Sequence, residues 1–86
     1  MPEISRFFGI VIGIFYNDHA PPHFHVRYND FRATLSISDL KILEGELPKR
    51  ALTLVLEWAF EHRGELMDDW ELAVEKKPLK PIRPLE

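Results

Sequence analysis

The chain has 86 residues, which leaves room for one domain with a single core. It contains no cysteine, so disulfide bonds and thiolate metal sites are excluded. The formal net charge is −3, so a nucleic-acid site would have to be a local basic patch. The longest apolar stretch, residues 7–16, is too short to span a bilayer, and no basic signal-peptide segment precedes it. We therefore expect a cytoplasmic protein with no membrane partner.

Residues 7–16 (FFGIVIGIFY) are mostly β-branched and aromatic, which predicts one continuous strand. Apolar side chains fall on both of its faces, as in a central strand that is covered on part of each side. Gly9 and Gly13 flank Val11 on one face. A glycine inside a strand indicates a bend or the close approach of another element.

Residues 23–28 and 31–37 alternate between apolar and polar side chains, and Asn29-Asp30 between them favours a two-residue hairpin turn. This loop length predicts a register that pairs apolar with apolar and polar with polar residues, and a slip of one residue would destroy the match. The polar face of the hairpin then carries six side chains, which are His23, His25, Arg27, Arg32, Thr34 and Ser36.

The second half of the chain predicts a short strand over residues 40–43 and two helices. The first helix opens at Pro48 and runs to about Arg63, where Gly64 either caps or kinks it. Its inward stripe consists of Leu52, Val55, Leu56, Ala59 and Phe60. Residues 65–77 form the second amphipathic helix.

Prolines at positions 78, 81 and 84 exclude further helix, so residues 78–86 form a Pro-rich tail that is extended or mobile. The predicted fold is a single α+β domain over residues 1–77. It consists of a small, mostly antiparallel meander of three or four strands, followed by two C-terminal helices packed on one sheet face.

Three histidines crowd into residues 17–25 (NDHAPPHFH), and imidazole can donate a proton, accept one or bind a metal. One hypothesis is a metal-independent ribonuclease. His23 and His25 would share the proton transfers, Arg27 and Arg32 would hold phosphate, and Thr34, with Ser36, would orient the substrate. Two arginines directly opposite each other repel, which favours an anion between them.

A metal site is another hypothesis for the same residues. His23 and His25 lie two apart on a strand, so their rings point the same way, and His19 or Asp18 could fold over as a third ligand. Three ligands plus water is the open pattern of catalytic zinc. Against it, the neighbouring arginines repel a cation and no carboxylate sits on the predicted strand face.

A third hypothesis gives the histidines a structural role and no catalytic or metal-binding role. The histidines would then be hydrogen-bonded scaffold for the Pro-Pro loop, and the polar face, or the helices, would bind a protein partner. An edge strand without cover would also permit a homodimer.

The sequence MPEISRFFGIVIGIFYNDHAPPHFHVRY, followed by LEGELPKRALTLVLEW, resembles a family of small prokaryotic proteins catalogued as domain of unknown function 4160. The resemblance runs from Pro2 to about Leu79 and includes the motif N-D-H-x-P-P-H-F-H-V. It implies one half of a two-gene module, a suspected toxin beside a cognate small antitoxin-like protein. Our leading expectation is therefore a toxin that acts on RNA through the histidine and arginine face. A partner-binding module and a metal-dependent hydrolase are the alternatives.

Overall fold

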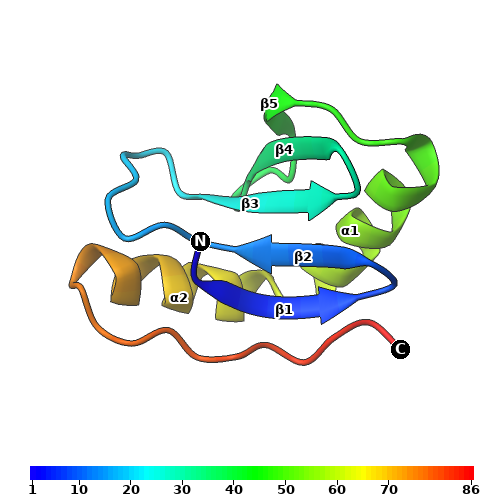
Figure 1. Ribbon diagram of the computed structural model, residues 1–86. Helices are drawn as coiled ribbons and strands as arrows, with labels where there is room; N and C mark the ends of the chain where they lie inside the picture. The colour runs from blue at the N-terminus through cyan, green and yellow to red at the C-terminus, as the bar shows by residue number, and fades with distance from the viewer.

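A computed structural model, which describes residues 1–86, consists of one five-stranded sheet with two helices on one of its faces (Figure 1). The strands are β1 (Glu3–Phe7), β2 (Ile10–Gly13), β3 (His23–Tyr28), β4 (Phe31–Ser36) and β5 (Ile42–Gly45). They lie in chain order, and each pair of neighbours is antiparallel. The helices are α1 (Lys49–Glu61) and α2 (Arg63–Val74). The α+β meander followed by two helices is confirmed, with five strands where three or four were predicted.

The additional strand comes from a turn inside the first apolar segment. A single strand over residues 7–16 was wrong, because the chain reverses at Phe8 and Gly9 and pairs β1 with β2. These two residues have φ angles of 49° and 79°, and glycine adopts such an angle at no steric cost. The segment is apolar on both sides of the turn, so its hydrophobic pattern does not mark the reversal.

The second glycine of that segment has a different role. A Cβ at Gly13 would lie 2.6 Å from the carbonyl oxygen of Pro2 and 2.5 Å from Cγ of Met1. The backbone N–H of Ile14 also donates to the Pro2 oxygen, at 3.2 Å. The predicted close approach is therefore made by the first two residues, which cross the sheet at this point.

The hairpin of β3 and β4 has the predicted register throughout. Tyr28 pairs with Phe31, and the pairing continues to His23 opposite Ser36. Asn29 takes the positive φ of the turn, at 52°, while Asp30 does not. The alternation of side chains therefore determined which residues share a face.

The helices differ in detail from the prediction. Only His62 separates α1 from α2, and Gly64 lies in the first turn of α2 rather than capping α1. Phe60, predicted to face inward, is 71% exposed, whereas Trp58 is fully buried. The Trp58 ring packs against Phe7 and Phe24, at centroid distances of 5.3 and 6.2 Å. The remaining core lies between the sheet and the helices and includes Ile10, Ile12, Val26, Leu35, Val55, Ala59 and Leu66.

The tail after α2 is extended and docked (Figure 1). It runs back along β1, where the N–H of Ile82 donates to the carbonyl of Ile4 at 2.7 Å. Ile82 itself is buried, and Nε1 of Trp58 donates to the carbonyl of Arg83 at 2.8 Å. The tail thus covers one edge of the sheet. Neither helix has the length and apolar character needed to cross a membrane.

Candidate functional site

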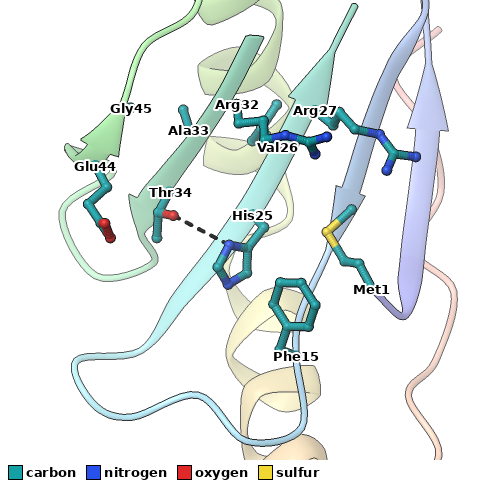
Figure 2. Close-up of a pocket in the computed structure, with 10 residues that line it drawn as sticks. All are labelled: Met1, Phe15, His25, Val26, Arg27, Arg32, Ala33, Thr34, Glu44 and Gly45. Carbon is teal, nitrogen blue, oxygen red and sulfur yellow. Dashed lines mark hydrogen bonds between the residues drawn. The ribbon is translucent and has the colours of Figure 1, made fainter. Parts of the chain in front are cut away.

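The sheet face opposite the helices carries a groove of about 440 Å³ (Figure 2). It runs across the middle strands, and polar side chains of the β3–β4 hairpin form its floor. The ten residues that line it are Met1, Phe15, His25, Val26, Arg27, Arg32, Ala33, Thr34, Glu44 and Gly45. Four of the six polar side chains predicted for the hairpin face therefore line an accessible concave surface, namely His25, Arg27, Arg32 and Thr34.

At the end of the groove nearest the 17–22 loop, one carboxylate contacts two imidazoles. Oδ2 of Asp18 lies 2.7 Å from Nε2 of His25 and 3.1 Å from Nε2 of His23. The three side chains are partly buried, with exposed fractions of 20% for Asp18, 22% for His25 and 12% for His23. These residues form what we call the Asp18 cluster.

The other ring nitrogens of the two histidines also have partners. Nδ1 of His23 lies 2.7 Å from the carbonyl oxygen of Pro21, which can only accept, so this nitrogen carries the hydrogen. Nδ1 of His25 lies 3.3 Å from the hydroxyl of Thr34, as Figure 2 shows. Both rings are thus held in a fixed orientation with Nε2 directed at Asp18.

Aromatic side chains pack against both imidazoles. Phe15 contacts His25 edge-on, with ring centroids 4.6 Å apart. The ring centroids of Trp70, on α2, and His23 lie 5.0 Å apart. The ring centroids of the two imidazoles, His23 and His25, lie 5.2 Å apart. These contacts restrict the rings beyond what the hydrogen bonds alone impose.

The arginines line the groove farther along the strands. Arg27 and Arg32 are directly opposed across β3 and β4, are exposed, and form no ion pair. The pKa of Glu3 is lowered mainly by its hydrogen bond with Arg6 and only in smaller part by the charge of Arg27. This carboxylate is therefore engaged elsewhere, and the two guanidinium groups remain available to an anion.

Two other predicted residues lie apart from the Asp18 cluster. His19 is exposed and outside the group of potential ligand atoms that Asp18 forms with the two strand histidines. Ser36 is buried, and its hydroxyl lies 3.2 Å from that of Ser38. Of the two loop residues considered as a third ligand, the structure thus brings Asp18 to the histidines.

Sequence reasoning missed three residues of the groove. Glu44 of β5 pairs with Thr34 across the strands, so a carboxylate does reach this face. Phe15 and Met1 close the side formed by β2 and the first residues. Residues 42–45 (ILEG) show no alternation of apolar and polar side chains, and the predicted strand ended at Leu43, so no signal in the sequence placed Glu44 on this face.

A family model described as a domain of unknown function, DUF4160, matches residues 9–71. The chain belongs to the DUF4160 family. In this DUF4160 protein the matched residues run from the β1–β2 turn into α2, and they include the Asp18 cluster and both groove arginines. No curated protein and no solved structure matches the chain. The description of the family names no activity, so function has to be inferred from the site.

Proposed function

We propose that this DUF4160 protein binds RNA in the groove and cleaves it there, as the toxin component of a toxin–antitoxin-type pair. The observation that carries the proposal is that two unpaired arginines line the same groove as His25, the residue through which the Asp18 cluster reaches it. A phosphodiester needs cations around the phosphate and proton-transferring groups beside it. The groove offers both, because Arg27 lies two residues beyond His25 on β3 and Arg32 lies opposite Arg27 on β4.

The arginines account for binding. Guanidinium pairs bidentately with phosphate, and an anion between Arg27 and Arg32 relieves the repulsion of two like charges directly opposite each other. Because the chain is acidic overall, this pair is a local site rather than part of a general basic surface.

The Asp18 cluster accounts for cleavage. The 2′ oxygen of RNA bonds to phosphorus and the bond from phosphorus to the 5′ oxygen breaks. One proton leaves the 2′ hydroxyl for the cluster, and one passes from the cluster to the 5′ oxygen. Atoms and electrons balance without an oxidant or a second substrate. Thr34 lies directly opposite His25 on β4, two residues from Arg32, and positions the ribose.

Binding is tested with a short single-stranded RNA over a range of salt concentrations. Each phosphate contact contributes a slope of about −0.7 to the logarithm of affinity against the logarithm of salt. Arg32→Gln should lower affinity and reduce the magnitude of the slope by about 0.7. Lys49→Gln, a change of the same charge at the start of α1 and outside the groove, should leave both unchanged. Equal effects of the two variants would argue against a phosphate site in the groove.

Cleavage is tested with the same RNA and with growth of cells that express the protein. The wild type should cut RNA and arrest growth, and His25→Ala should lose both effects. His62→Ala is the matched control, because His62 lies at the α1–α2 junction and pairs with Glu65. A folded His25→Ala protein with wild-type activity, or a wild type that leaves RNA intact, would refute the proposal.

Binding of a protein partner is the second candidate, and β5 favours it. All four residues of this edge strand are exposed, including the apolar Ile42 and Leu43, and it pairs only with β4. An edge of this kind accepts a further strand. Hydrogen exchange at β5 should slow when the cognate small protein is added. If two copies pair instead, the mass of the protein in solution should double without a partner.

A further inference from the structure

We propose that the Asp18 cluster binds one divalent transition-metal ion through Oδ2 of Asp18 and the Nε2 atoms of His23 and His25. These three atoms lie within 4.8 Å of one another, and they belong to three side chains that are all partly buried. Two imidazoles and one carboxylate form a common ligand set for zinc and for iron(II).

The spacing of the ligand atoms fits an ion of this size. Zinc bonds to histidine nitrogen and carboxylate oxygen are about 2.0–2.2 Å long, so tetrahedral ligand atoms lie roughly 3.3–3.5 Å apart. The observed separations from Asp18 Oδ2 are 2.7 and 3.1 Å. Tetrahedral spacing would lengthen the contact of Oδ2 with His25 by about 0.6–0.8 Å and the contact with His23 by about 0.2–0.4 Å, while all three ligand atoms already lie within 4.8 Å of one another.

The tautomer of His23 provides an independent argument. Its Nδ1 donates to the carbonyl of Pro21, so in the neutral ring Nε2 holds a lone pair. That lone pair faces the carboxylate oxygen of Asp18 at 3.1 Å, and two electron-rich atoms in contact repel. Either a proton on Nε2 or a metal ion between the two atoms removes the repulsion, and the metal titration below distinguishes the two.

The surroundings of both histidines match those of metal ligands. A ligating imidazole generally donates its other N–H to a carbonyl, hydroxyl or carboxylate, which fixes the ring and raises its basicity. Pro21 has this role for His23, and Thr34 can have it for His25. Packing against Phe15 and Trp70 further limits the movement of the rings.

The charges of the groove are compatible with an ion at this end. Asp18 supplies one negative charge directly, and the arginines lie on the far side of His25 from the loop that carries Asp18. An ion with three protein ligands keeps a position for water, whose pKa it lowers to about 7. Use of such a water in RNA cleavage rests on the function proposed above, whereas metal binding itself does not.

The experiment uses the untagged full chain, freed of metal with a chelator and titrated with Zn²⁺ by calorimetry and with Co²⁺ by visible absorption. We expect one ion per chain and the d–d bands of a low-coordinate cobalt site. Asp18→Asn should weaken affinity by more than the roughly 10- to 100-fold typical of a lost outer contact, and Thr34→Val should fall within that range. Zn²⁺ should also raise the melting temperature of the wild type but not of Asp18→Asn.

The matched controls are His19→Ala and His62→Ala, which remove the two histidines outside the cluster. Both should bind Zn²⁺ as the wild type does. A wild type that takes up no stoichiometric ion, an Asp18→Asn protein with unchanged affinity, or equal losses in the two controls would each overturn the metal site. RNA cleavage that persists in chelator would also separate the two proposals, because it preserves the proposed function while removing the metal from it. Binding of one metal ion per chain by a protein that leaves RNA intact would support the metal site and refute the proposed RNA cleavage.

Discussion

Oδ2 of Asp18 lies 2.7 Å from Nε2 of His25, although the two residues are seven positions apart in the chain. The contact ties the loop before β3 to the outer face of the sheet. Since the same oxygen is 3.1 Å from His23, one carboxylate orients both imidazoles. Asp18 thus anchors the loop together with the backbone hydrogen bond from Ile37 to Pro22 and the contact of His23 with the Pro21 carbonyl.

Loss of the Asp18 charge should destabilise the metal-free protein. Hydrogen bonds to charged groups contribute about 1.5–3 kcal/mol, and the carboxylate is 20% exposed, so we expect Asp18→Asn to cost about 1–2 kcal/mol. Urea unfolding in the presence of chelator measures this change. His19→Ala in the same loop should change stability by less than about 0.5 kcal/mol. Similar values for the two variants would mean that the contact does not hold the loop.

Removal of one groove arginine should relieve repulsion. Arg27 and Arg32 are directly opposed and unpaired, and like charges in this position destabilise a sheet by about 0.2–1 kcal/mol. Arg32→Gln should therefore raise the free energy of unfolding by a few tenths of a kcal/mol at low salt. The gain should vanish at high salt, where exposed charges are screened. A loss of stability at low salt would show that Arg32 makes a favourable contact instead.

The docked tail should contribute to the core. Ile82 is 4% exposed, and truncation of a buried isoleucine to alanine costs about 2–5 kcal/mol. Ile82→Ala should fall within this range in denaturant unfolding and should make residues 78–86 more sensitive to protease. Arg83→Ala, whose side chain is 79% exposed, is the neighbouring control and should be close to neutral. Equal, small effects would indicate a mobile tail.

Asp69 should give the protein a distinctive pH dependence. This carboxyl is 1% exposed, accepts the N–H of Lys80 through Oδ1 at 2.8 Å, and leaves Oδ2 without a partner. Burial raises the pKa of Asp69 above its ordinary value of 3.8. At pH values between 3.8 and the raised pKa, Asp69 is protonated in the native state and ionised in the unfolded state. The stability that Asp69 contributes should therefore fall as pH rises through this interval.

The test for Asp69 is a comparison of urea unfolding at several pH values between wild type and Asp69→Asn. The stability difference between the two should change across the acid interval in the direction just given and become constant above the raised pKa. Asp68→Asn, an exposed neighbour on α2, should not reproduce the effect. A difference that is independent of pH would mean that Asp69 keeps an ordinary pKa.

Several features followed from the sequence by itself. The alternation of residues 23–37 and the turn length between them determined the register of β3 and β4, because side chains repeat every two residues and a slip would bury the polar set. The same rule put His25, Arg27 and Thr34 on one face. The prolines of the tail likewise excluded a third helix.

Only the tertiary structure decided the rest. Residues 7–16 are apolar before and after the point where the chain reverses. The spacing of apolar residues therefore could not predict the Phe8-Gly9 turn or the additional strand β1. Loop residues have no periodicity at all, so nothing local distinguished Asp18 from His19 as the partner of the histidines. Glu44 joins the groove because β5 pairs with β4. Each of these outcomes depends on contacts between segments distant in sequence, and local propensity does not contain that information.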